Sequence, residues 1–235
     1  MQIALSETNL TAAQWNLLQP LRPAPSQMGR PPTERRWVIE AILYIVKGGI
    51  PGRLLPTGFP PWQTVHSIFR KWTLDPTWES LNDCLRGRTR KQQGKRGRPT
   101  AAILDSQSVK SAGHGGRVGS DAAKQSQGRK RPRLVDTLGL VLGVLVTAAA
   151  GPERAGARSL RAGVLGWFTW WRRRWVDGGD SGPEFAAWVR TLRPKLEVEV
   201  VKRSDKVPGF KLLPRRWVVE RTLGWLMRHR RRLRD

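Results

Sequence analysis

The stretch AAILDSQSVK, residues 101–110, begins with an apolar run that closes on Asp105. Such a run predicts a buried β-strand, and a carboxylate at its end is unfavourable unless it is paired, capped or bound to a metal ion. The stretch RRWVDGG, residues 173–179, repeats this arrangement with Asp177, and its two glycines allow a ligand to approach the backbone closely. Both stretches therefore predict strands that end in a carboxylate with a possible functional role.

The segments around these two strands predict an α/β fold. A hairpin is expected around LVDTLG, where Asp136 is read as a turn former. The predicted order is β, ββ, α, β, α, β, α, which indicates a mixed sheet with helices packed on it. The expected elements after the first strand are the hairpin strands 131–135 and 140–150, the strands 173–179 and 196–203, and the helices 157–171, 182–192 and 215–232.

Glu220 is the third carboxylate in an unusual setting, within the predicted helix 215–232. At about 100° per residue, four residues fall within about 60° of it around the helix axis: Trp217, Leu223, Gly224 and Met227. Glu220 thus interrupts an apolar face, where a glutamate is unexpected. Most other acids are expected at helix caps, on outer faces or in loops.

Three carboxylates without a His or Cys partner suit a hard cation, Mg²⁺ or Mn²⁺. Two such ions can activate an attacking oxygen and stabilise the leaving oxygen of a phosphodiester. The competing interpretation is that each acid pairs with a nearby arginine, and the spacing alone leaves both open.

Residues 1–86 predict helices separated by proline loops, which indicates a small all-α domain. Thr11 and Gln14 have capping-box spacing at the start of the first helix. The other helices are expected over 34–47, with Thr33 as the cap, over 62–72 and over 76–87. Residues 87–100 predict a basic, mobile linker, and residues 101–235 form the third part of the chain.

The chain has 43 Lys and Arg against 18 Asp and Glu, a net charge of +25. This charge indicates a polyanionic partner, and nucleic acid is favoured over a membrane because the basic residues are spread along the chain. No apolar run approaches the roughly 20 residues needed to span a bilayer. The single Cys84 excludes an internal disulfide, and a cytoplasmic protein is expected.

Several of these stretches together resemble the DDE transposases of bacterial insertion sequences, which have an RNase H-like core. The resemblance is carried by ILDSQSVK, GRKR, LVDTLGL, WVDGGDSG and RRWVVERTLGWLMRHRR, and in the N-terminal region by GRPPTERRWVIEAILYIVKGGIP. It implies an RNase H-like catalytic domain over 101–235 after a helical DNA-binding domain. It also implies that Asp105, Asp177 and Glu220 form a catalytic triad that binds Mg²⁺ or Mn²⁺.

The resemblance further implies cleavage of element ends and their transfer to target DNA. The implied partners are double-stranded DNA, at terminal inverted repeats and target sites, and a second copy of the chain in a homodimer. Nucleoid association in a bacterial cytoplasm follows from the same resemblance.

Basic residues near the triad then become candidate DNA contacts. Lys110 and the run Arg129, Lys130 and Arg131 are expected to bind the DNA backbone. Arg216 and Arg221 flank Glu220 and are expected to hold phosphates or to orient the carboxylates. Trp217 and Trp225 are expected in the core rather than as base-stacking residues.

The chain also departs from the family pattern. Gly52 stands where a tryptophan is usual after GIP, and the chain stops at Asp235, where relatives usually continue. The alternative function is therefore a truncated, catalytically defective transposase that only binds DNA. An RNA-binding protein is a third interpretation, although it leaves the three acids unexplained.

Overall fold

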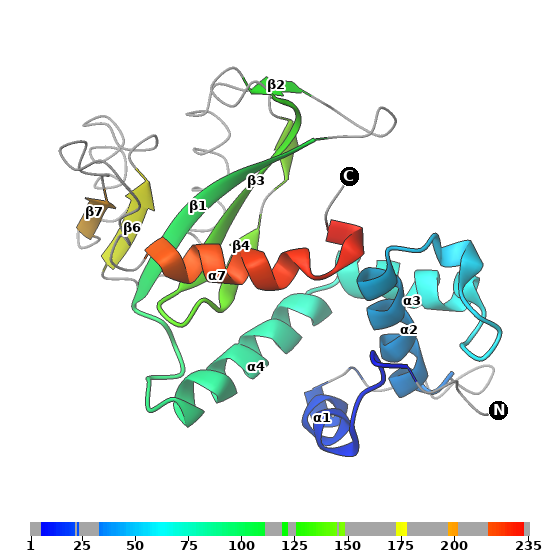
Figure 1. The fold of residues 1–235 in the computed structure, drawn as a ribbon. Coiled ribbons are helices and arrows are strands. Elements are labelled where there is room, and N and C mark those ends of the chain that lie inside the picture. The colour runs from blue at the N-terminus through cyan, green and yellow to red at the C-terminus, as the bar shows by residue number, and fades with distance from the viewer. Residues whose placement is uncertain are drawn as a thin grey trace. The chain divides into compact units, whose positions relative to one another are not determined.

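A computed structural model of the chain describes residues 6–21, 23, 33–110, 119–121, 126–144, 146–148, 173–177, 197–201 and 216–232 (Figure 1). The helices expected over 157–171 and 182–192 lie outside these residues. The chain divides into two compact units. A helical unit contains Met1–Lys95 and Met227–Leu233, and a sheet unit contains Arg96–Leu226 and Arg234–Asp235.

The described residues of the helical unit form α-helices, as the apolar patterns between the prolines predicted, and also short 3-10 turns that were not predicted. Its helices are α1 (Ala12–Leu18), α2 (Arg35–Gly48), α3 (Trp62–Leu74) and α4 (Thr77–Gln92), and its 3-10 turns are η1 (Gln19–Leu21), η2 (Gly52–Leu54) and η4 (Arg230–Arg232).

Local signals set most helix ends. The capping box of Thr11 and Gln14 is present at the start of α1, which confirms that prediction. The cap expected at Thr33 was wrong, because α2 begins after Glu34, whose carboxylate accepts the Arg36 N–H at 3.3 Å. Helix α4 continues to Gln92, so residues 87–92 of the expected linker are helical.

Two apolar clusters form the core of the helical unit, and α2 contributes to both. One cluster contains Val38, Ala41, Ile42, Phe59 and Val65. The other contains Trp15, Ile39 and Trp72. Because the clusters lie on different sides of α2, five consecutive residues, 38–42, are buried instead of a single stripe.

Glu40 lies within this buried run, with 2% of its surface exposed. Its Oε1 atom accepts hydrogen bonds from the Leu10 backbone N–H and from Arg36 Nε, both at 3.0 Å. Arg36 also donates to the Leu10 carbonyl. The expectation that acids of this region lie at caps or outer faces was wrong for Glu40, because Arg36 compensates its charge and a chain segment 30 residues away donates a backbone N–H to it.

The described residues of the sheet unit form seven strands in one sheet, with the order β2-β3-β1-β6-β7, and β4 and β5 pair with β3. Its elements are β1 (Ala101–Lys110), β2 (Gly119–Asp121), β3 (Ser126–Asp136), β4 (Val141–Val144), β5 (Thr147–Ala148), β6 (Arg173–Asp177), β7 (Glu197–Val201) and the helix α7 (Arg216–Met227).

The sheet is mixed, as the sequence predicted. Strand β1 is antiparallel to β3 and parallel to β6, and β6 is parallel to β7. Strands β3 and β4 form the predicted antiparallel hairpin. Strand boundaries differed from those predicted: β1 continues past Asp105 to Lys110, and β3 begins at Ser126 instead of residue 131, because these two long strands pair with each other.

Helix α7 packs on the sheet through Val218 and Val219. These residues form a buried cluster with Ile103 of β1 and Val135 of β3. Polar contacts add to this packing, because the Thr222 hydroxyl donates to the Gly139 carbonyl at 2.8 Å. Hydrophobic burial and the hairpin turn therefore both hold α7 against β1 and β3.

Candidate active site and nucleic-acid interface

Asp105 and Asp177 occupy equivalent positions on two neighbouring parallel strands. The β1–β6 ladder ends with the pair Ile103 and Trp175, and each aspartate lies two residues beyond that pair on its own strand. Paired strands are about 4.8 Å apart, and both aspartates follow the last pair of this ladder. The backbone therefore places two acids, 72 positions apart in the sequence, just past the same end of the β1–β6 ladder.

The end of the β1–β6 ladder is a candidate ligand-binding site. Asp177 is the last residue of β6, and β1 pairs only with β3 beyond Ile103 among the described residues. Ligands in open α/β sheets bind outside the carboxyl ends of the parallel strands. Asp177 lies at such an end, and Asp105 lies just past the parallel part of β1, which itself continues to Lys110.

Glu220 lies on α7, directly after Val219 of the cluster that contains Ile103. Its side chain is exposed, together with those of Trp217 and Met227, whereas Leu223 is half-buried against the cluster. The expectation that Glu220 interrupts a buried apolar face was wrong, because the buried face of α7 is formed by Val218, Val219 and Thr222.

Asp136 is a turn residue, as the sequence predicted. It is fully buried, and its Oδ1 atom accepts the backbone N–H groups of Leu138 and Leu140, each at 2.9 Å. The carboxylate therefore replaces water as the acceptor for the hairpin backbone. Its structural role separates Asp136 from the three candidate carboxylates.

Arg133 is the Cα partner of Asp105 across the β1–β3 ladder, and it is buried, with 6% of its surface exposed. The sheet thus contains an arginine at the cross-strand position of a candidate carboxylate. Under the competing interpretation, in which each acid pairs with an arginine, Arg133 is the candidate partner of Asp105.

The predicted basic residues Lys110, Arg129, Lys130 and Arg131 lie in one part of the β1–β3 ladder. Lys110 is registered with Gly128, and the three basic residues of β3 face positions 107–109 of β1. Their backbone positions are therefore close to one another, on the continuation of the strand that carries Asp105. The side chains of Lys110 and Lys130 lie outside the described part of the structure, as does that of Arg216 at the start of α7.

Arg221 is held between two tryptophans on α7. Its guanidinium carbon lies 4.6 Å from the Trp217 ring centroid and 4.8 Å from that of Trp225. Arg221 also donates to the Leu138 carbonyl at 2.9 Å. The prediction that both tryptophans lie in the core was wrong: Trp217 is 39% exposed and Trp225 is 48% exposed, because α7 packs on the sheet through other residues, Val218 and Val219.

The three candidate carboxylates provide only oxygen donors, which is the chemistry that Mg²⁺ and Mn²⁺ prefer. Among the side chains that the structure describes, no three His, Cys, Asp or Glu residues are grouped to hold a metal ion. That set does not include the side chains of Asp105 and Asp177. The shared register of the two aspartates nevertheless fits a cation between neighbouring strands.

None of the helices described by the structure has the length and apolar character needed to cross a membrane.

The sheet is mixed, two aspartates follow the parallel ladder of β1 and β6, and basic residues cluster in the β1–β3 ladder, which is the arrangement that the sequence predicted for a nucleic-acid-processing protein. Comparison with protein families assigns it further. Residues 96–235 match the family described as "Transposase DDE domain", and residues 10–102 match the family described as "Putative transposase of IS4/5 family". The chain belongs to the DDE transposase family of insertion sequences. A search of curated proteins found no match.

Proposed function

We propose that this chain cleaves the DNA strands at the ends of an insertion sequence and transfers them to target DNA in a metal-dependent reaction. Asp105, Asp177 and Glu220 are the proposed catalytic residues, and they would hold Mg²⁺ or Mn²⁺. When bound, the metal ions would activate the attacking oxygen and stabilise the leaving oxygen at phosphorus.

The observation that carries this proposal is the register of Asp105 and Asp177. Two carboxylates at equivalent positions on adjacent parallel strands repel one another unless a cation lies between them. The chain has an excess of 25 positive charges, so acids near bound phosphates are unfavourable without such a cation. A metal-binding role explains both acids with one ligand.

Glu220 would complete the ligand set from α7. The helix is fixed on β1 and β3 by the cluster that contains Val218 and Val219, and by the hydrogen bond from Thr222 to the hairpin turn. These contacts limit how far Glu220 can move relative to β1. Val218, Val219 and Thr222 are therefore proposed positioning residues, which act through the helix.

The DNA itself would contact the basic ladder. Lys110, Arg129, Lys130 and Arg131 lie on the two strands that continue from the Asp105 position. Arg216 and Arg221 of α7 are proposed as further contacts to the DNA phosphates. Cations in this position would hold the phosphate backbone, so that the scissile phosphodiester lies at the carboxylates.

The proposed partners are the terminal inverted repeats of the element, the target DNA and a second copy of the chain. The dimer is tested by light scattering of the purified protein with and without an oligonucleotide duplex. A mass of one chain in both samples would contradict it.

The catalytic proposal is tested with duplexes that carry the inverted repeats flanking the gene. We expect strand nicking with Mg²⁺ or Mn²⁺ and none with EDTA. Asp105→Asn and Asp177→Asn remove one negative charge each and should abolish nicking, with duplex affinity retained. Glu79→Gln is the matched control, since Glu79 is an exposed acid of the helical unit, and it should cleave like the unmodified chain.

Cleavage that persists in Asp105→Asn would refute the triad assignment. If the unmodified chain binds the duplex but does not cut it with either metal, the alternative of a DNA-binding protein without catalysis is supported instead. If Asp105→Asn lowers stability and leaves cleavage intact, Asp105 serves as a structural partner of Arg133.

A further inference from the structure

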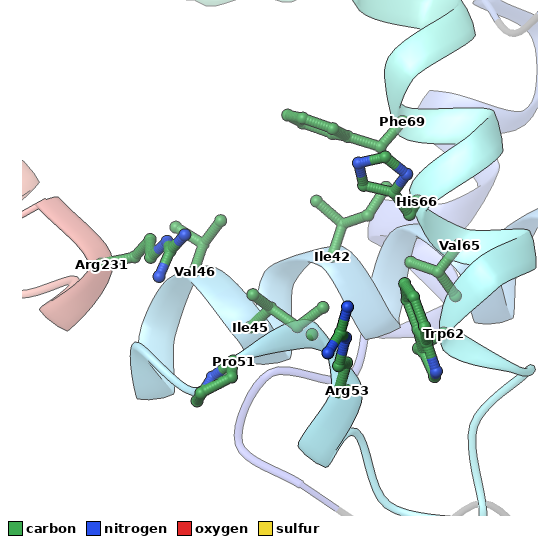
Figure 2. A pocket seen from close by; sticks show the side chains of 11 residues that line it. Ile42, Ile45, Val46, Pro51, Arg53, Trp62, Val65, His66, Phe69 and Arg231 are labelled. Atoms are coloured by element: carbon green, nitrogen blue, oxygen red, sulfur yellow. The ribbon is translucent and has the colours of Figure 1, made fainter. Parts of the chain in front are cut away.

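The helical unit contains a pocket of about 470 Å³ between α2, η2, α3 and η4 (Figure 2). Pockets of about 300–1,000 Å³ are typical of small-molecule and cofactor sites. Ile42, Ile45 and Val65 form part of its apolar wall, and Trp62 and Phe69 add two aromatic rings. Phe69 is 43% exposed, so the pocket is open to solvent on that side.

The polar groups that line the pocket are basic. Arg53, His66 and Arg231 are among its lining residues, and each is exposed at the rim. The Arg53 guanidinium carbon lies 5.5 Å from the centroid of the Trp62 ring. No Asp or Glu is among the lining residues. An apolar ligand with an adjacent negative charge is complementary to this arrangement.

We propose that this pocket binds a single unstacked nucleobase of the DNA, with the adjacent phosphates held by Arg53 and Arg231. A nucleobase is flat and apolar on its faces, so it can stack on Trp62 or Phe69. Its backbone carries the negative charge that the basic rim requires. An apolar protein side chain would fill the same wall but would leave the basic rim without a partner.

The inference rests on the DNA-binding part of the proposed function and not on its catalytic part. The pocket lies wholly in the helical unit, whereas the candidate carboxylates lie in the sheet unit. Base binding can therefore be measured without divalent metal, and a failure of catalysis does not affect the result.

Gly52 offers a way to block the pocket without removing any of its side chains. It lines the pocket, and a Cβ atom built on it meets no atom within 4 Å. Gly52→Trp should therefore place an indole into the open space. Leu54→Trp is the matched control, because Leu54 is in the same 3-10 turn, is 68% exposed and is not a lining residue.

The experiment uses two duplexes of the same sequence, one fully paired and one with an unpaired 2-aminopurine. Affinities are measured by fluorescence anisotropy in EDTA, together with the 2-aminopurine emission. We expect the unmodified chain to prefer the unpaired duplex by roughly five- to hundredfold, the equivalent of one base–aromatic stack. Gly52→Trp should remove the preference, whereas Leu54→Trp should keep it.

Arg53→Gln provides a second variant that leaves the apolar wall intact. It should weaken binding of the unpaired duplex more than binding of the paired duplex. Circular dichroism establishes that each variant is folded before binding is compared.

Equal affinity of the unmodified chain for both duplexes would overturn the inference. So would a preference that Gly52→Trp leaves unchanged. If Gly52→Trp instead changes the oligomeric state without changing the preference, the pocket binds a protein segment and the nucleobase assignment is wrong. Asp105→Asn should retain the preference, which separates this result from the test of catalysis.

Discussion

Gly139 connects the fold to the candidate active site, and replacing it with alanine tests that connection. The residue has a φ of 83°, in the left-handed region, in the turn between β3 and β4. A Cβ atom there would lie 2.6 Å from Thr222 Oγ1 and 3.3 Å from Val218 Cγ1. Both neighbours belong to the face of α7 that packs on the sheet. Gly139→Ala should therefore push α7 away from the hairpin.

The expected effect has two parts. A left-handed conformation destabilises a residue with a Cβ atom by roughly 1–2 kcal/mol. Overpacking against α7 adds about 1–3 kcal/mol, since a contact of 2.6 Å requires the helix or the turn to shift. The sheet unit should lose about 2–5 kcal/mol in its free energy of unfolding.

Gly94→Ala is the matched control. Gly94 also has a left-handed φ, of 65°, but a Cβ atom built there meets nothing within 4 Å. Only the backbone term of about 1–2 kcal/mol should remain. Hydrogen exchange measures the loss of stability of each variant in the unit that contains the substitution. For Gly139→Ala we expect the largest loss of protection in peptides from α7.

A double-mutant cycle with Thr222→Ala isolates the clash. Removing the hydroxyl should offset part of the damage caused by Gly139→Ala, with a coupling of about 0.5–3 kcal/mol between residues in contact. The predicted clash is refuted if Gly139→Ala destabilises its unit no more than Gly94→Ala does. It is also refuted if the free-energy changes of Gly139→Ala and Thr222→Ala are additive. If Glu220 is catalytic, Gly139→Ala should also slow metal-dependent nicking.

Three further outcomes follow from the contacts. Glu40→Ala should destabilise the helical unit by about 2–4 kcal/mol, because it leaves two donors without their acceptor while Arg36, 34% exposed, stays partly hydrated. Urea unfolding measures the loss of stability. A loss as small as that of Glu79→Ala would contradict the prediction. Arg221→Lys should lose about 1–2 kcal/mol, since lysine cannot stack as a planar cation between two indoles while donating to the hairpin; an unchanged urea midpoint would contradict this. The logarithm of the association constant for a DNA duplex should fall linearly with the logarithm of the salt concentration. Lys110→Gln should make this slope shallower by about one, the value of one lost phosphate contact. The same slope for the variant and the unmodified chain would exclude Lys110 from the interface.

Much of the fold followed from local sequence signals. The capping box at Thr11, the apolar spacing of α3 and the turn chemistry of Asp136 each involve residues within a few positions of one another. Such contacts form in the same way in almost any fold that contains the segment. For this reason the hairpin and the mixed character of the sheet were predicted.

The errors arose where distant segments meet. Glu40 is buried because the backbone at Leu10 and the side chain of Arg36 compensate its charge. Trp217 and Trp225 are exposed because β1 and β3 pack against the neighbouring residues of α7. Periodicity identified an apolar stripe on each helix, but it does not specify which side of the helix faces the core.

The sequence by itself determined that Asp105 and Asp177 each follow an apolar run, because this pattern can be recognised from neighbouring residues alone. Only the tertiary structure decided that both runs lie on adjacent parallel strands, that Glu40 is buried and Glu220 exposed, and that residues 227–233 belong to the helical unit. Strand order and register depend on hydrogen bonds and packing between segments far apart in the chain, and no local pattern encodes these contacts.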